Sequence, residues 1–311
     1  MLRPAPAPLH QVYDAALLDL DGVLYLGTDP IAHAADAVAA ARAGGMHAAF
    51  VTNNSSGRAA AVAEHLSELG IPATPEDVIT SSQAVVGLLN RQLPTGAKVL
   101  VVGSEGLADE LAEGGFVPVR SADGVAAVVQ GLEPKTAWTD LAEAAVAIAA
   151  GALWVAGNTD STVPSPRGLL PGNGAMVQAL VHTTGKRPIV VGKPEPELFR
   201  ASVERVRAQR PLVIGDRLDT DIVGANRAGL PSLLVLTGVT TREDLLAAAP
   251  DHRPTYVASD LRGLVSAHPE AVVDGDTARC GAATAGPDGP SDDSDDALRA
   301  SCALAWVRSG S

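Results

Sequence analysis

The feature that most constrains the fold is a regular alternation of short apolar runs with helical stretches along most of the chain. The apolar runs lie at 15–20, 47–51, 189–191, 212–214 and 233–236. Runs of this length are typical of buried strands, and helices between such strands are typical of a mostly parallel sheet. The sequence therefore predicts an α/β protein whose strands lie side by side with helices covering them.

End signals place the first helices between these strands. Asp29 as N-cap, Pro30 at the first helical position and the stop at 44–45 predict one helix. A second helix is expected from about residue 58 to 70, and a short third strand at 77–80.

The middle of the chain carries its own strand and helix signals, so it is long enough to form an inserted α/β domain. The predicted elements are strands at 99–102, 125–129 and 153–156, with helices at 107–113 and 139–150. The apolar stretch 144–157 allows two interpretations, ordinary core burial or an interaction surface. We expect the first sheet to resume at 189–191.

These signals predict a Rossmann-like parallel-sheet core domain with a large inserted α/β cap domain. The parts are a flexible N-terminus at 1–11, the core at 12–83 plus 188–265, the cap at 84–187 and a C-terminal extension at 266–311. Within the extension, 281–296 is rich in Ala, Gly, Pro, Ser and Asp, which favours a flexible acidic linker and partial disorder. A short helix is expected from about 295 to 308.

Composition excludes several classes of partner. The formal net charge of -13 argues against nucleic acid and against anionic membrane surfaces, which bind basic faces. The apolar stretch 144–157 is shorter than the roughly 18 residues that span a bilayer, and the first residues do not resemble a signal peptide. Cys280 and Cys302 are expected to be ordinary reduced thiols. We therefore expect a cytoplasmic location.

Polar residues follow the predicted strands of the core at the point where each strand ends. These residues are Asp19 and Asp21, Thr52 and Asn53, Lys193, and Asp216 and Asp221. In open α/β sheets, ligands bind outside the carboxyl ends of the strands. The sequence therefore predicts one site that combines carboxylates, small hydrogen-bond donors and a cation.

The segment from Asp19 to Gly22 has two interpretations. It could be a strand end followed by two turn-forming aspartates. Alternatively, two carboxylates two residues apart on an extended segment face the same way and can share one task. Gly22 lets the chain turn sharply after them. The segment is not a calcium-binding EF-hand, because its glycine comes too early and no later glutamate completes the loop.

The donor segments also have two readings each. Thr52, Asn53 and Asn54 could simply cap the next helix, or could cradle a phosphate at that helix N-terminus. Lys193 could be a surface lysine, but its place directly after an apolar run favours a buried site.

Three aspartates, Asp216, Asp219 and Asp221, repel one another after the run 212–214 unless a cation is present or they serve as caps. Magnesium prefers one or two carboxylates together with waters and substrate oxygens. Asp19 and Asp216 would supply those carboxylates, and Asp221 would orient its neighbours. Asp219 is expected to face solvent.

Together, these segments resemble the haloacid dehalogenase-like hydrolase superfamily, in its phosphatase branch. The resemblance rests on Asp-Leu-Asp-Gly-Val at 19–23, Thr-Asn-Asn-Ser at 52–55, Gly-Lys-Pro at 192–194 and Gly-Asp-Arg-Leu-Asp-Thr-Asp at 215–221. The segments 158–160 and 168–172 look like the cap of the class IIA subgroup that includes 4-nitrophenylphosphatases and phosphoglycolate phosphatases. The similarity covers roughly residues 12–265.

The resemblance implies a role for each of these residues. Asp19 would attack phosphorus to form an aspartyl-phosphate, and Asp21 would act as acid and base. Magnesium would be held by Asp19, the Asp21 carbonyl and Asp216. Phosphate contacts would come from Thr52, Asn53, Asn54 and Lys193. Asp21 argues against a true dehalogenase, which lacks a second aspartate there.

The substrate is then expected to be a small phosphorylated metabolite, because a large cap excludes bulky phosphoproteins. The segment 273–280 is similar to the extension of some bacterial D-glycerol-3-phosphate phosphatases, so glycerol 3-phosphate ranks first. Phosphoglycolate and other sugar or nucleotide monophosphates are the alternatives. A non-catalytic phosphate-binding regulatory protein is the rival class. The resemblance also makes a homodimer through the cap plausible.

Overall fold

The structure is a computed structural model of the chain, and it describes residues 2–54, 59–163 and 167–309. The chain divides into two compact units. The first unit comprises 1–51, 64–77 and 202–311, and the second comprises 52–63 and 78–201. Within the described residues, no helix combines the length and apolar character that crossing a membrane requires.

The first unit is built on parallel strands that run in the order β15-β14-β13-β1-β4. The strands are β1 (Ala15–Leu18), β4 (His47–Thr52), β13 (Pro211–Gly215), β14 (Ser232–Val235) and β15 (Tyr256–Ala258). Strand β1 lies between β13 and β4, in parallel register with both. All four of its residues are buried, as expected for a strand covered on both faces.

Helices and short turns complete this unit. They are α1 (Leu9–Val12), α2 (Ala34–Ala43), α9 (Val223–Ala228), α10 (Arg242–Leu246) and the short helices Pro75–Asp77, Pro250–His252 and Leu261–Leu264. The division between the units falls within α3 (Ala59–Glu68) and again within α8 (Glu197–Val206). The predicted helix start at Pro30 is wrong, because Tyr25–Leu26 (β2) and Asp29–Pro30 (β3) form a hairpin. The turn between them reverses the chain before α2 can begin.

The second unit contains a five-stranded parallel sheet in the order β12-β9-β8-β6-β7. Its strands are β6 (Lys98–Val102), β7 (Val117–Val119), β8 (Ala127–Gln130), β9 (Leu153–Ala156) and β12 (Ile189–Val190). The other elements are β5 (Val78–Thr80), α4 (Ser81–Gln92), α5 (Glu105–Glu113), α6 (Trp138–Ala149), α7 (Asn173–Thr184) and the hairpin β10 (Thr162–Val163) and β11 (Leu170–Pro171). The α/β class and the sheet-plus-helix cap are thus confirmed.

One strand lies in a different sheet from the one predicted. We expected the first sheet to resume at 189–191, but β12 pairs in parallel with β9. A short apolar run carries no information about which sheet it joins, and here the run completes the edge of the second sheet. The apolar stretch 144–157 is largely core, since Ala144, Ile148 and Trp154 are buried together.

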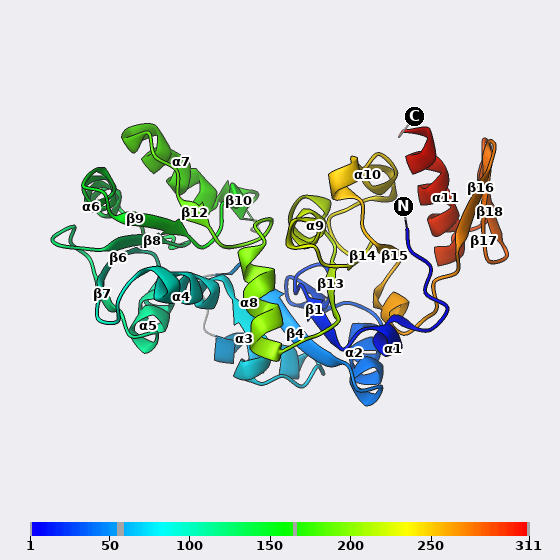
Figure 1. Cartoon of the computed structure of the whole chain (residues 1–311), viewed down its shortest axis with the longest axis horizontal. Helices are drawn as coiled ribbons and strands as arrows, with labels where there is room; N and C mark the ends of the chain where they lie inside the picture. Colours follow the sequence, from blue (N-terminus) through cyan, green and yellow to red (C-terminus); the bar gives the residue numbers. More distant parts are fainter. Residues whose placement is uncertain (1, 55–58, 164–166, 310–311) are drawn as a thin grey trace. The chain divides into compact units, whose positions relative to one another are not determined.

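The C-terminal extension folds onto the first unit. Four antiparallel strands, in the order β16-β17-β18-β19, pack against one face of α11. They are β16 (Ala271–Asp274), β17 (Thr277–Cys280), β18 (Ala283–Gly286), β19 (Gly289–Pro290), and the helix α11 is Asp295–Arg308. Figure 1 shows this sheet beside α11 near the C-terminus. The helix expected at about 295–308 is confirmed.

Two segments that we expected to be flexible make backbone hydrogen bonds to other parts of the chain. Within the stretch 281–296, expected to be a linker, residues 283–286 and 289–290 form β18 and β19, and small side chains of β18 alternate inward against α11. The N-terminal residues are also fixed, since Ala5 exchanges both backbone hydrogen bonds with His268 at 2.8 and 2.7 Å. Because the buried positions of this small sheet are mostly alanines, they give little alternation of large apolar and polar residues. The composition of the stretch therefore indicated disorder.

Candidate active site

The first aspartate of the site continues the central strand β1. The Asp19 amide donates to Ile214 O at 2.8 Å, so the ladder with β13 extends one residue past the end of β1. Asp19 is half-buried and Asp21 is exposed. Between Leu20 and Tyr25 the chain forms a tight turn, in which Gly22 has φ +85° and donates to Tyr25 O at 2.8 Å. Asp21 therefore lies at the turn rather than on the strand, and its Oδ1 accepts from the Gly27 amide at 3.4 Å.

Three carboxylates of the first unit come together at the carboxyl end of the sheet. Oxygens of Asp19, Asp216 and Asp221 all lie within 4.8 Å of one another. Asp216 and Asp221 are both buried, at 1% and 0% exposure. Asp216 follows β13, and Asp221 lies in a single π-helical turn, Leu218–Ile222, that begins two residues later. The Asp221 carboxylate accepts the Arg217 amide at 3.2 Å, which fixes its direction.

Buried carboxylates this close repel one another strongly unless a cation or proton offsets their charge. The donor set is all oxygen, which is the chemistry that magnesium and calcium select. Asp219, which we expected to face solvent, does so and pairs with Arg217 at 2.8 Å. The residues present therefore fit a hard divalent cation.

The Asp216 carboxylate is held in a cradle that only small residues permit. A Cβ added at Gly22 would lie 2.4 Å from the Asp216 carboxylate, and one at Gly238 would lie 2.1 Å from its Oδ2. The Val239 amide donates to Oδ2 at 2.6 Å, and Thr237 Oγ1 donates to Gly22 O at 2.6 Å. The loop after β14 therefore joins the two carboxylate-bearing turns.

Sequence reasoning missed Tyr25 as a neighbour of the carboxylates. Burial, together with the negative charges of Asp19 and Asp21, raises the pKa of Tyr25 to about 12. Its ring also meets His65 edge-on, with centroids 5.1 Å apart. The tyrosine follows the aspartate segment by only a few residues, but no periodic pattern indicates which way its side chain turns. Thr237 and Val239 were missed for the same reason.

In the second unit, Asn53 and Lys193 form a pair. Asn53 Oδ1 accepts the Lys193 amide at 2.7 Å, and Asn53 Nδ2 donates to Lys193 O at 3.0 Å. Lys193 is 3% exposed and precedes a cis peptide bond to Pro194. Its Nζ lies 6.0 Å from the centre of the Phe199 ring. The expected buried lysine is therefore present, and the Asn53 side chain has the unexpected task of holding its backbone.

Further amides extend this second cluster. Asn158 Nδ2 and Ser81 Oγ both donate to Asn53 O, at 3.0 and 2.8 Å. Asn173 Nδ2 donates to Asn158 O at 2.7 Å and is itself buried. Thr52 is 9% exposed, and its Oγ1 accepts the amide of the exposed Asn54 at 3.1 Å. Ser55, the last residue of the donor motif, lies outside the described residues.

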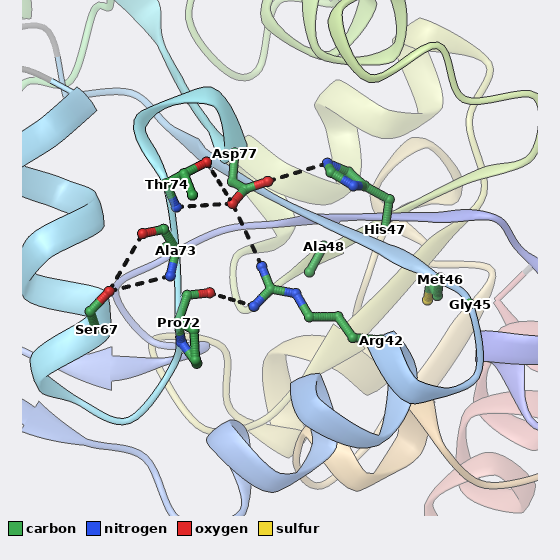
Figure 2. Close-up of a pocket in the computed structure, with 10 residues that line it drawn as sticks. All are labelled: Arg42, Gly45, Met46, His47, Ala48, Ser67, Pro72, Ala73, Thr74 and Asp77. Carbon is green, nitrogen blue, oxygen red and sulfur yellow. Dashed lines mark hydrogen bonds and ion pairs between the residues drawn. The ribbon is translucent and has the colours of Figure 1, made fainter.

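A separate hollow of about 510 Å³ lies at the other end of β4 (Figure 2). There Arg42 Nη2 and His47 Nε2 lie 3.9 and 3.6 Å from the Asp77 carboxylate. The Thr74 amide and hydroxyl also donate to Asp77 Oδ2. His47 begins β4 whereas Thr52 ends it, so the hollow lies at the amino end of the strand. Its polar groups bind the turn before β5 to the end of α2, and it is distinct from the carboxylate cluster.

Comparisons with known proteins agree with this geometry. Residues 16–117 match the family model described as haloacid dehalogenase-like hydrolase, and 190–264 match a second HAD-hydrolase-like model. A D-glycerol 3-phosphate phosphatase of Mycobacterium tuberculosis is 54% identical over 82% of this chain and 72% of its own length. An acid sugar phosphatase of Staphylococcus aureus is 37% identical over 82% of this chain and 97% of its own.

Solved structures point the same way. A glycerol phosphate phosphatase from Mycobacterium tuberculosis in complex with magnesium superimposes with a TM-score of 0.86 at 46% identity, covering 99% of this chain and 93% of that one. A p-nitrophenyl phosphatase from Archaeoglobus fulgidus gives 0.76 at 31% identity, covering 81% and 98%. The carboxylate cluster, the lysine and these similarities agree, and the chain belongs to the haloacid dehalogenase-like hydrolases, as an enzyme of the branch that hydrolyses phosphomonoesters.

Proposed function

We propose that this protein is a magnesium-dependent phosphatase that hydrolyses small phosphomonoesters through an aspartyl-phosphate. Glycerol 3-phosphate is the substrate that we rank first. The observation that carries the proposal is the cluster of Asp19, Asp216 and Asp221 carboxylates within 4.8 Å of one another. The repulsion within such a cluster destabilises the folded state unless the cluster binds a cation. In this proposal Asp19 is the nucleophile, next to the cation that offsets the charge of a phosphoryl group.

The chemical steps follow from the two aspartates of the first turn. An Asp19 carboxylate oxygen attacks phosphorus, the ester P–O bond breaks, and Asp21 donates a proton to the leaving alkoxide. Asp21 then takes a proton from the water that attacks the aspartyl-phosphate, which releases inorganic phosphate and restores Asp19. The turn position of Asp21, exposed and next to the Gly27 amide, leaves it accessible to the leaving group.

Magnesium is the cation we assign to the cluster. Asp19, the Asp21 carbonyl and Asp216 would hold it, and Asp221, fixed by the Arg217 amide, would orient or complete this set. When bound, magnesium neutralises charge on the phosphoryl oxygens and on the nucleophile. The phosphoryl oxygens are also assigned to Thr52, Asn53, Asn54 and Lys193, whose small donors and single cation suit that charge.

Glycerol 3-phosphate ranks first because the relative with 54% identity is a D-glycerol 3-phosphate phosphatase. Phosphoglycolate and other sugar or nucleotide monophosphates are the alternatives, since relatives of 37% identity include an acid sugar phosphatase. A panel of these esters, assayed for phosphate release with Mg²⁺, tests the ranking. A higher kcat/KM for any other ester than for glycerol 3-phosphate would displace it.

Paired Asp→Asn variants test the chemistry itself. Asp19→Asn removes the nucleophile, so turnover should fall by at least roughly 10³-fold. Asp219→Asn is the matched control, because Asp219 is exposed and pairs only at the surface with Arg217. Activity in the control should stay within about twofold of wild type. Unchanged turnover in Asp19→Asn would refute the nucleophile assignment. Tight binding of phosphate esters without turnover by wild type would favour the regulatory alternative.

A homodimer and a cytoplasmic location complete the proposal. On α6, Trp138 and Val146 are 80% and 60% exposed, and a second copy of the chain is the partner that we propose for them. Light scattering at micromolar concentration should give twice the chain mass for wild type and less for Trp138→Glu. Cys280 and Cys302 are both buried free thiols, which suits a reducing compartment.

A further inference from the structure

The C-terminal helix α11 packs one face against the part of the first unit that carries the acidic turn. Leu298, Cys302 and Trp306 are spaced by four residues and therefore lie on one face of the helix. All three are buried, at 0%, 0% and 2% exposure. They share one apolar cluster with residues of the sheet side, namely Ile222, Leu234, Leu245 and Val257. Figure 1 shows α11 between the small sheet and α10.

Two members of this cluster directly flank the elements that carry or hold the carboxylates. Ile222 is fully buried and follows Asp221 in the π-helical turn. Leu245 lies in α10, whose N-cap Thr241 ends the loop that donates the Val239 amide to Asp216. A shift of either element would therefore move a metal-binding carboxylate.

Trp306 is the residue that connects α11 to α10 most specifically. Its Nε1 donates to Leu245 O at 3.1 Å, within the last turn of α10. The Arg253 guanidinium also lies 5.4 Å from the centre of the ring, and Arg253 Nη2 donates to Ser309 Oγ at 2.7 Å. The indole is thus held by packing, a cation–π contact and a hydrogen bond.

We propose that Trp306 is a positioning residue for the magnesium site. It contacts neither the metal nor the substrate, but holds α10 and the π-helical turn in the arrangement in which Asp216 and Asp221 face one another. The C-terminal extension then contributes to metal affinity in addition to covering the sheet. This inference rests on the proposed function, because it takes the carboxylate cluster as the magnesium site.

The same helix supplies a matched control. Leu304 lies on the face of α11 that packs against the small sheet, in a cluster with Ala278, Cys280 and Ala285. It is 5% exposed, close to the 2% of Trp306. Leu304→Ala therefore opens a cavity on the far side of α11, away from α10. A role in general stability alone would make Trp306→Ala and Leu304→Ala behave alike once both are folded.

The test is calorimetric titration of the full chain with Mg²⁺ alone, well below the unfolding temperature of each variant. For Trp306→Ala we expect the Mg²⁺ dissociation constant to rise roughly 3- to 10-fold, in the range that packed residues without ligand contact contribute. Trp306→Phe keeps a ring but loses the donor, so its rise should be smaller, about twofold. Leu304→Ala should bind Mg²⁺ as wild type does, although its unfolding temperature falls.

A second readout is the rise in unfolding temperature that saturating Mg²⁺ produces, which should shrink in Trp306→Ala and not in Leu304→Ala. Equal affinities in Trp306→Ala and wild type, or equal losses in both alanine variants, would overturn the proposal. If Trp306→Ala does not fold, Trp306→Phe decides, and an unchanged dissociation constant overturns it. Because no substrate is present, a wild type that binds Mg²⁺ but hydrolyses no ester would refute the proposed function alone.

Discussion

Gly238→Ala should displace the Asp216 carboxylate and leave the rest of the fold intact. The added Cβ would lie 2.1 Å from Asp216 Oδ2 and 2.7 Å from Gly22 Cα. Non-bonded heavy atoms need about 3.5 Å, and the backbone of Gly22 blocks movement on the other side. The Asp216 carboxylate must therefore shift by more than about 1 Å and weaken its 2.6 Å bond from the Val239 amide.

A displacement of about 1 Å at a reacting centre costs roughly 10²-fold in rate, or about 2.7 kcal/mol. We expect kcat/KM of Gly238→Ala for glycerol 3-phosphate to fall by that factor. The Mg²⁺ concentration for half-maximal activity should rise, because we propose the Asp216 carboxylate as a ligand of the metal. The assay is initial phosphate release over a series of Mg²⁺ concentrations, with circular dichroism to establish that the variant is folded.

Gly87→Ala is the control for the same substitution elsewhere. Gly87 lies within α4, and an added Cβ meets nothing closer than Arg91 Nη1 at 3.9 Å. This change should raise the free energy of unfolding by up to about 1 kcal/mol and leave activity unchanged. If Gly238→Ala keeps both kcat/KM and its Mg²⁺ dependence, Asp216 does not bind the metal from this cradle and the reasoning fails.

Three further changes probe the supports of the site and of the extension. Thr237→Val removes the hydrogen bond to Gly22 O and should lower kcat/KM roughly 3- to 10-fold; an unchanged rate would show that this link is dispensable. Asn53→Ala removes both hydrogen bonds to the Lys193 backbone and should lower kcat/KM roughly 10- to 100-fold, whereas a larger KM with the same kcat would assign it to substrate binding alone. Burial lowers the pKa of His268 to about 4, so its neutral form stabilises the fold above the ordinary pKa of about 6.5 and that stability is lost as pH falls toward 4. Urea unfolding at pH 7 and 5 should show a loss about 1–2 kcal/mol larger in wild type than in His268→Gln, and equal losses would exclude His268 as the cause.

The parts of the fold that could be predicted are those with a local pattern. The runs before Asp19 and Asp216 are short, apolar and bounded by turn residues, and they became β1 and β13. The helix at 295–308 has a serine N-cap and acidic residues in its first turn, which are signals within a few positions of one another. Membership of one sheet or another has no such signal, and β12 was therefore assigned to the wrong sheet.

Residue types at the strand ends identified the carboxylates and the lysine, because the chemistry of each side chain is visible without coordinates. What holds them was not visible. Val239 donates to Asp216 across 23 positions of sequence, and Thr237 donates to Gly22 across 215. Asn53 holds Lys193 across 140. Such contacts depend on how strands pair, and many sequences of the same local pattern would pair differently.

The sequence by itself thus determined an α/β chain with acidic strand ends suited to phosphoryl transfer. The strand ends also predicted that Asp19, Asp216 and Asp221 share one site. Only the tertiary structure decided how closely their oxygens approach, that Tyr25 lies beside Asp19 and Asp21, and that Trp306 donates to α10. The physical reason is the range of each interaction. Strand and helix formation follow from periodicity and caps within a window of residues, whereas convergence follows from long-range packing, which in this alanine-rich core carries little local signature.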